Sequence, residues 1–199
     1  PPWVRPVVDM DALLAEGDPW WQLALKPSEA QRKEVRESTL ALDGIKELVL
    51  DGVVDVEGTN EFLGAAGNYP RLVGMQTDLY RCFMSLVWGH ASDQGISGLI
   101  HPESHFTDQK AGALRHGAYS HLRRHWQFIN ELQLFEIDHH VSYGIHIYGV
   151  DLVTPRFIMA SSLYHPETVE RSLLHNGDGI EPGLKTADGQ WDISAHRGR

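Results

Sequence analysis

The chain has 199 residues, of which 42% are hydrophobic, and its formal net charge at pH 7 is -10. This length and apolar content suffice for one domain with its own core, while the acidic balance argues against a domain that grips nucleic acid through a broad basic surface. The single cysteine, Cys82, excludes an internal disulfide and a four-cysteine zinc site. Because no apolar run approaches membrane-spanning length and no signal peptide opens the sequence, we expect a cytoplasmic protein without a membrane partner.

The first third of the sequence contains two helix signatures and one irregular region. Residues 9–16 have the pattern of a short amphipathic helix capped by an aspartate. A capping box at Ser28 and Gln31 predicts the start of a second, longer helix. Residues 45–50 fit either a strand or a helix. The frequent Gly, Asn and Asp residues over 51–69 predict an irregular inserted loop.

The middle of the sequence predicts α/β structure. A helix is expected from Asp78 to about Trp88, with Thr77 as its cap. The stretch GISGLIHPESHF, residues 95–106, is an apolar run that ends in a polar loop with a proline. It suits a strand buried on both faces in a parallel sheet, whose C-terminal loop is a common place for ligands. A helix over about 108–126 follows, with one basic side made of Lys110, Arg115, Arg123 and Arg124.

The last third predicts strands. Residues 128–134 and 142–148 alternate apolar and polar positions, and the connection between them is too short for a crossover helix, so antiparallel pairing is expected. A further strand is expected over 156–161. The segment 176–199 is rich in Gly, Pro and Asp and has the composition of a linker.

Twelve histidines raise the question of a metal site. His101 and His105, or His121 and His125, have spacings compatible with shared coordination. No cysteine or carboxylate completes a recognisable ligand set in the sequence. We therefore predict no metal site and expect the histidines to be solvated or hydrogen-bonded.

Four ordered blocks carry a resemblance to a known family. They are Pro1-Pro2-Trp3, then Asp78-Leu79-Tyr80 opening a helix, then GLIHPESHFTDQKAG, and finally FINELQLFEI with SYGIHIYG. Together they resemble the amino-group DNA methyltransferases, in particular the adenine-specific methylases of type IIG restriction-modification systems. The catalytic loop of that family reads Asn-Pro-Pro-aromatic at the end of a strand, and Pro1, Pro2 and Trp3 match its last three positions.

The resemblance implies an α/β fold of the class I S-adenosylmethionine-dependent methyltransferase-like (Rossmann-like) type, represented by its C-terminal half, with a mixed sheet ending in an antiparallel hairpin. Residues 1–175 would form a partial catalytic domain with an insertion at 9–70, and 176–199 would be a linker toward a missing target-recognition domain. The glycine-rich loop that holds S-adenosylmethionine in the family would precede Pro1. The cofactor site is then incomplete in this chain, and we expect the isolated fragment to be inactive.

The resemblance also assigns roles around a flipped adenine. The backbone carbonyl of Pro1 would accept a hydrogen bond from the adenine amine, and the proline rings of Pro1 and Pro2 would fix the loop. A base extruded from double-stranded DNA needs an aromatic surface, which Trp3 would provide on one side and Phe135 on the other. Both aromatic residues have an alternative reading as packing residues.

Three further residues belong to this expected site. The loop that begins at His101 and Pro102 lies near the catalytic pocket in the family, so these two would shape the substrate pocket. Asp78 matches a position near the adenine of the cofactor. An acidic residue in the first turn of a helix also interacts favourably with the helix dipole, so a structural role for Asp78 remains open.

The expected function is transfer of a methyl group to the exocyclic amine of adenine in double-stranded DNA, in a restriction-modification or phage-defence system, with DNA contacts made through flanking domains. One alternative is methylation of RNA or of a protein amide, because the same loop serves other planar amines and amides. A second alternative is a non-catalytic remnant or interaction module that keeps the fold without the chemistry.

Overall fold

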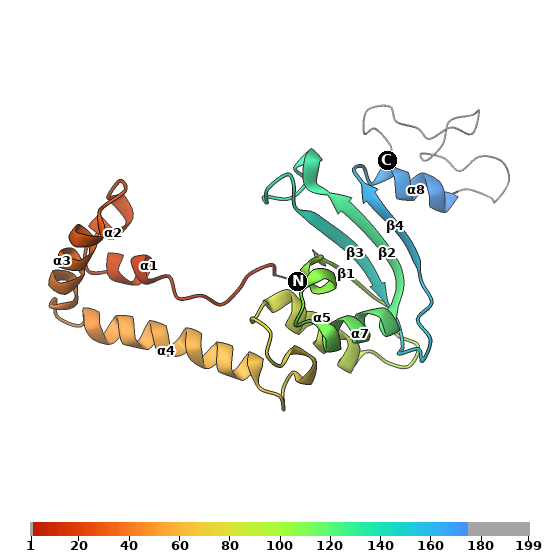
Figure 1. The fold of residues 1–199 in the computed structure, drawn as a ribbon, viewed down its shortest axis with the longest axis horizontal. Coiled ribbons are helices and arrows are strands. Elements are labelled where there is room, and N and C mark those ends of the chain that lie inside the picture. Colours follow the sequence, from red (N-terminus) through yellow and green to blue (C-terminus); the bar gives the residue numbers. More distant parts are fainter. Residues whose placement is uncertain (1, 175–199) are drawn as a thin grey trace. The chain divides into compact units, whose positions relative to one another are not determined.

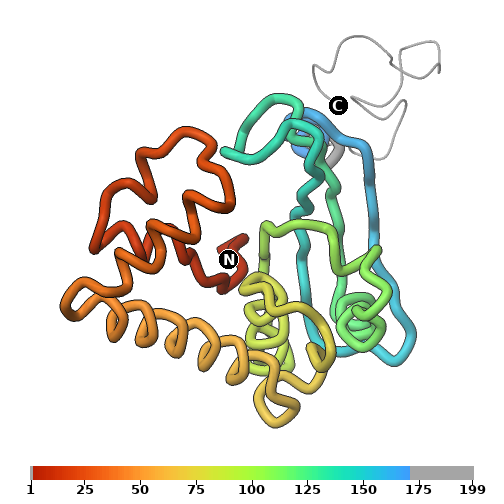
Figure 2. Tube along the Cα trace, turned by 60° about the vertical axis from the view of Figure 1, so that its left-hand side comes forward, coloured from red at the N-terminus to blue at the C-terminus, as the bar shows by residue number. Residues whose placement is uncertain are grey.

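The computed structural model describes residues 2–174 and divides the chain into two compact units (Figures 1 and 2). The helical unit comprises Arg5–Thr77. The sheet unit comprises the segment up to Val4 together with the chain from Asp78 onward. The helical unit is thus an insertion in the sheet unit, with wider bounds than the expected 9–70.

The helical unit is built from four α-helices and one short 3₁₀ helix among its described residues. These are α1 (Met10–Ala15), α2 (Trp20–Leu23), α3 (Glu29–Leu40), α4 (Ile45–Gly64) and η1 (Pro70–Leu72). Asp9 caps α1, and the capping box of Ser28 and Gln31 opens α3, so both signatures are confirmed. The core consists of Leu14, Trp21 and Val49.

The prediction of an irregular loop over 51–69 is wrong, because most of this region belongs to the 20-residue helix α4. Val49 and Val53 lie one turn apart and face the core of the helical unit. Gly52 weakens helix propensity, but a side chain there would overlap Leu13, so its glycine permits close packing of α1 against α4. Tertiary packing has overridden the local composition.

The sheet unit is mixed α/β. Its described elements are α5 (Leu79–His90), β1 (Ser97–Pro102), α6 (Ser104–Thr107), α7 (Gly112–His121), β2 (Leu122–Ile129), η2 (Asn130–Leu132), β3 (Ser142–Tyr148), β4 (Ile158–Leu163) and α8 (Glu167–Leu174). The strands form one sheet in the order β1-β3-β2-β4. β3 is antiparallel to both neighbours, and β4 is parallel to β2. The predicted helix after Asp78, the strand at 142–148 and its antiparallel pairing are confirmed, although Asp78 rather than Thr77 is the cap.

Three strand and helix predictions need correction. The helix expected to reach residue 126 ends at His121, because residues 122–129 pair with β3 as strand β2. The basic pair Arg123 and Arg124 therefore lies on a strand and not on a helix face. β2 ends before 134, since Asn130 turns the chain by donating to the carbonyls of Phe135 and Ile137. The last strand begins at 158 rather than 156.

The expectation of a parallel strand buried on both faces is also wrong for β1. Within the described residues β1 is an edge strand with a single, antiparallel neighbour. One of its edges therefore has no strand beside it, and Ile100 remains 38% exposed. Pairing with β3 places β1 next to the hairpin β2–β3, which positions the loop after Pro102 over the sheet.

Alternation along the strands gives the sheet two different faces. The apolar face carries the core of Phe128, Tyr143 and Leu163, onto which Val169 of α8 packs. The histidine face carries His101, His125 and His146, one from each of β1, β2 and β3, and all three are buried. The candidate site is built on the second face.

Candidate functional site

Helix α5 covers the histidine face with a stripe of large side chains. Tyr80, Met84 and Trp88 recur every fourth residue, so they share one side of the helix, and all are buried. The Tyr80 ring stacks on the ring of His101, with centroids 5.2 Å apart and an interplanar angle of 20°. Helix α5 therefore covers the part of the histidine face that lies on β1.

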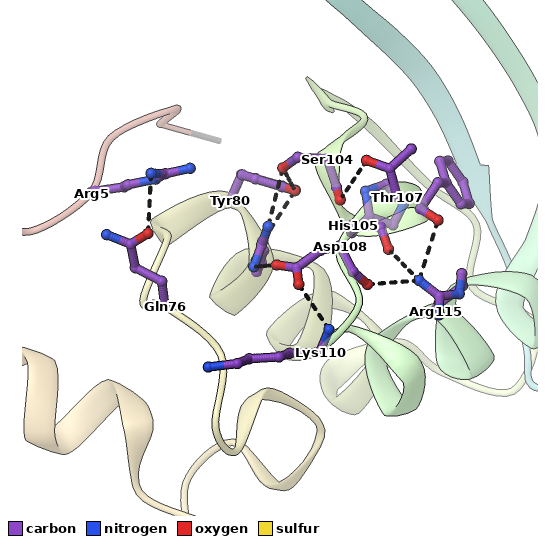
Figure 3. Close-up of polar contacts among 11 residues, drawn as sticks. Arg5, Gln76, Tyr80, Ser104, His105, Thr107, Asp108, Lys110 and Arg115 are labelled. Carbon is purple, nitrogen blue, oxygen red and sulfur yellow. Dashed lines mark hydrogen bonds and ion pairs between the residues drawn. The ribbon is translucent and has the colours of Figure 1, made fainter.

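A buried arginine fixes the loop that follows β1 (Figure 3). Arg81 donates to Asp108 Oδ2 at 2.9 Å and to Ser104 Oγ at 3.1 Å, and the Tyr80 hydroxyl lies 2.8 Å from Ser104 Oγ. Burial by itself would lower the pKa of Arg81, but the hydrogen bonds to Tyr80 and Asp108 raise it overall. A charged buried arginine thus ties α5 to the loop.

Arg115 of α7 closes the same loop from the other end. Its Nη1 donates to the backbone carbonyls of His105, Phe106 and Asp108, at 3.3, 3.2 and 3.0 Å. Figure 3 shows Arg115 pointing at these carbonyls from α7. This predicted basic residue therefore binds protein backbone. Between β1 and α7 the chain is held at both ends, which orients Glu103.

The carboxylate of Glu103 lies against two histidines of the hairpin. Its Oε1 accepts a hydrogen bond from Nε2 of His125 at 2.5 Å and lies 3.2 Å from Nε2 of His146. Its Oε2 accepts a hydrogen bond from Nε2 of Gln127 at 2.9 Å. His125 and His146 are register partners on β2 and β3, and their rings stack with centroids 4.5 Å apart. One carboxylate oxygen is thus shared by two imidazoles.

Two further imidazoles complete the histidine cluster, defined as Glu103 with His101, His105, His125 and His146. His101 stacks on His146 with ring centroids 3.9 Å apart, and its Nε2 lies 3.1 Å from the Tyr148 hydroxyl. His105 lies beside it, with its ring centroid 5.7 Å from that of His146. Both ring nitrogens of His105 are buried without a hydrogen-bond partner among the described residues.

Burial controls the charge of the cluster. Desolvation lowers the pKa of His105 to about 3 and that of His101 well below its usual value. Burial alone would raise the pKa of Glu103, but its hydrogen bond with His125 and the electrostatic effect of the nearby His125 and His146 rings outweigh this and lower it to about 2. Desolvation also lowers the pKa of His146. At neutral pH the site therefore holds an ionised carboxylate together with neutral imidazoles at His101, His105 and His146.

The space for this carboxylate depends on Gly144. A Cβ atom at Gly144 would overlap Glu103 Oε1 and the His146 ring. Gly144 is the register partner of both His101 and Gln127, so it lies at the centre of the three strands. Its missing side chain leaves the space above β3 that the carboxylate fills.

A second cluster lies on the apolar face. In the aromatic cluster, Trp3 contacts Phe135 with ring centroids 5.0 Å apart and Tyr143 with centroids 6.2 Å apart. The Trp3 indole donates to the carbonyl of Ile100 at 3.0 Å, and the amide of Leu79 donates to the carbonyl of Val4 at 3.0 Å. The N-terminal segment is thus fixed next to β1 and to the start of α5.

The structure brings together two of the residues predicted for the base-binding site. Trp3 and Phe135 are in direct contact, so a planar base enters between them only if one ring moves. Pro2 is exposed beside Trp3, and Pro1 and the predicted linker 176–199 lie outside the described residues. His101 projects from the opposite face of the sheet, so it is separated from the aromatic cluster. Pro102 is the register partner of Tyr143 and lies on the same face as Trp3.

The residue predicted to lie near the cofactor is found at the start of α5. Asp78 is the N-cap of α5 and is only 7% exposed. The other described residues include no candidate for holding S-adenosylmethionine that the sequence singled out.

Comparisons with known proteins identify no relative: no family model matches the chain, and no curated protein matches it significantly. Over residues 2–174, none of the helices is both long enough and apolar enough to span a bilayer. The interpretation of the site therefore depends on its own geometry and on the four sequence blocks.

Sequence reasoning missed Glu103 and His146 as partners of His125, because the three residues come from three separate elements. A signal for His146 was present, since it lies on the polar side of a strand whose other side carries Tyr143 and Ile145. A histidine in such a position, on the same side of the strand as Gly144, indicates that this side of the sheet is polar and that a helix can bury it. Nothing in the local sequence around Glu103 indicates its contacts.

Proposed function

We propose that this chain forms the second half of the catalytic domain of a DNA methyltransferase, which transfers a methyl group from S-adenosylmethionine to the exocyclic amine of adenine. The observation that carries the proposal is the contact of Trp3 with Phe135 and Tyr143 beside β1. The segment resembling the catalytic loop and the strand block FINELQLFEI are distant in sequence, and the fold joins them at one place. The resemblance assigned these same two residues to the two sides of the target base.

The topology supports the same proposal. The fold class expected from the resemblance has a mixed sheet ending in an antiparallel hairpin. Here β2 and β3 form an antiparallel hairpin, with β3 lying between β1 and β2, although the sheet does not end in this hairpin because β4 pairs with β2 beyond it. The loop after β1 lies at the carboxyl end of that strand, which is the end of the strands at which open α/β sheets bind ligands.

In the proposed reaction the chain supplies positioning. The amine lone pair of adenine is delocalised into the ring, so a backbone carbonyl such as that of Pro1 must accept one of its hydrogens and orient it. Extrusion of the base costs a few kcal/mol, and stacking on Trp3 offsets roughly 1 to 3 kcal/mol of this cost. Residues that hold the cofactor would come from outside the described part of the chain.

The test is a substitution at Trp3 in the full coding sequence that contains this chain. Trp3→Ala should reduce methyl transfer to duplex DNA by about 5- to 150-fold, which corresponds to the loss of one stacked base, while Trp3→Phe should keep most of the activity. Phe62 of the helical unit, 60% exposed, is the matched control, and Phe62→Ala should leave the rate unchanged. The readout is incorporation of labelled methyl groups, with circular dichroism to check the fold.

Two results would contradict the proposal. Equal rates for folded Trp3→Ala and the unsubstituted protein would remove the stacking role. The second is that the unsubstituted full-length protein does not methylate DNA. Methyl transfer to RNA or protein would then favour the first alternative function, and no transfer at all would favour a non-catalytic module.

A further inference from the structure

Three side chains from separate elements point their donor atoms at one buried position. Glu103 follows β1, His125 belongs to β2 and His146 to β3. One ligand atom from each lies within 4.8 Å of those of the other two. Both histidines are at least 98% buried, at 2% and 0% exposure, and the carboxylate side chain is 12% exposed.

The backbone fixes which nitrogen of His146 faces the carboxylate. Its Nδ1 lies 3.1 Å from the carbonyl oxygen of Gly144, and a carbonyl only accepts, so Nδ1 carries the proton. In a neutral imidazole Nε2 then has a lone pair and no hydrogen. This fully buried Nε2 lies 3.2 Å from Glu103 Oε1 and makes no hydrogen bond to any residue that the structure describes. Two electron-pair donors face each other, an arrangement that a cation between them stabilises.

The same backbone contact is typical of metal-binding histidines. A ligating imidazole commonly donates its other N–H to a backbone carbonyl or a carboxylate, which fixes its orientation. On the oxygen side, Gln127 donates to Glu103 Oε2 and holds the carboxylate in place. Beside this position, His105 adds two buried nitrogens that have no hydrogen-bond partner within residues 2–174.

We propose that Glu103, His125 and His146 bind one divalent transition-metal ion, with Zn²⁺ as the best fit. Two imidazole nitrogens and one carboxylate oxygen are a ligand set that suits zinc. Zinc ligands at about 2.0 to 2.1 Å from the ion are roughly 3.4 Å apart in a tetrahedral site, so Glu103 and His125 would separate by about 1 Å from their hydrogen-bonded positions. The ion joins the loop after β1 to the hairpin β2–β3, at a place separate from the aromatic cluster and independent of methyl transfer.

A second set of donor atoms supplies the control. Asp138, His139 and His140 also bring their ligand atoms within 4.8 Å of one another, but all three are exposed on the loop before β3. Such surface groups remain hydrated without a metal. The double variant His139→Ala/His140→Ala removes this set and leaves the buried one intact.

The experiment is a titration of the metal-free 199-residue chain with Co²⁺, followed by competition with Zn²⁺. We expect one equivalent of Co²⁺ to bind with the intense visible bands of a tetrahedral site, and Zn²⁺ to remove them. The bands should persist in His139→Ala/His140→Ala. Glu103→Gln, which keeps the shape of the side chain, and His125→Gln should each weaken binding at least 10-fold.

Several outcomes would overturn the proposal. One is the absence of these bands in the unsubstituted chain, which would make the cluster a hydrogen-bonded network only. Another is their loss in His139→Ala/His140→Ala, or their persistence with unchanged affinity in folded Glu103→Gln and His125→Gln. If the buried substitutions prevent folding, the spectra of the unsubstituted chain and of the His139→Ala/His140→Ala control still decide the question.

Discussion

The two faces of the sheet are formed by the same strands, but one buries apolar side chains and the other buries histidines. On the apolar face, Phe128, Tyr143 and Leu163 pack with aromatic and aliphatic neighbours, and burial of carbon stabilises the fold. On the histidine face, His101 and His146 are equally buried, yet their nitrogens must find partners. A core that only needed stability would have apolar residues on both faces. The polar groups of the histidine face are instead accommodated by hydrogen bonds and ring stacking.

The largest expected loss of stability comes from a substitution in the apolar face. Phe128 is 1% exposed and stacks on Tyr143, with centroids 5.6 Å apart. Phe128→Ala should lower the free energy of unfolding by about 3 to 5 kcal/mol, because it leaves a cavity in the core. Urea unfolding measures this loss.

The same truncation on the other face sharpens the comparison. His105→Ala also removes a buried ring, but it relieves two desolvated nitrogens that have no hydrogen-bond partner among the described residues. It should therefore cost less than Phe128→Ala. Equal losses would show that the histidine face is stabilised as a packed core.

An intermediate effect is expected at Gly144. Gly144→Ala places a methyl group where Glu103 and His146 meet, and overpacking of this kind costs about 1 to 3 kcal/mol. Gly98 on β1 is the matched control, because a Cβ there makes an ordinary contact with Ile147 at 3.4 Å. Urea unfolding of the two variants should show a clear loss only for Gly144→Ala, and equal stability would place Glu103 elsewhere.

The smallest expected effect is the change in the free energy of unfolding per pH unit, measured in the presence of a chelator. The pKa of His105 falls from 6.5 to about 3 on folding, and that of His101 is also lowered well below 6.5. Below pH 6.5 the unfolded chain therefore binds more protons than the folded chain. Stability should be greatest above pH 6.5 and fall on acidification, by up to about 1.4 kcal/mol per pH unit for each histidine. Glu103 adds to the loss between pH 4.5 and about 2, because the unfolded chain protonates first.

The control for this pH profile is His105→Phe, which has no titrating ring. Its unfolding free energy should decline less steeply between pH 6.5 and 4.5 than that of the unsubstituted chain. Parallel profiles would contradict the assignment of His105 as a buried neutral histidine.

Local signals predicted the elements that depend on local physics. The capping box of Ser28 and the alternation of β3 both appear in the structure as expected. The end of α7 was not predictable from its period, because pairing of β2 with β3 competes with helix beyond His121. Nor was α4, whose glycines are offset by packing against Leu14 and Trp21.

The candidate sites divide in the same way. The resemblance to a family placed Trp3 and Phe135 on the two sides of a target base, and the direct contact between their rings was not predicted. The meeting of Glu103 with His125 and His146 was missed, because it depends on strand order and register, which a single sequence does not specify. Spacing along the chain suggested a pair of His121 and His125, whereas in the sheet His125 is paired with His146.

The junction between the two units has an evolutionary consequence. The carbonyl of Val4 accepts from the amide of Leu79, and Arg5 donates to Gln76 at 3.2 Å, so the chain leaves the sheet unit and returns to it at one point. Insertions with adjoining ends can be gained or lost without disturbing the host fold. The 73-residue excursion Arg5–Thr77 is therefore a cassette that could be exchanged as a block between related proteins, while the sheet evolves under its own constraints.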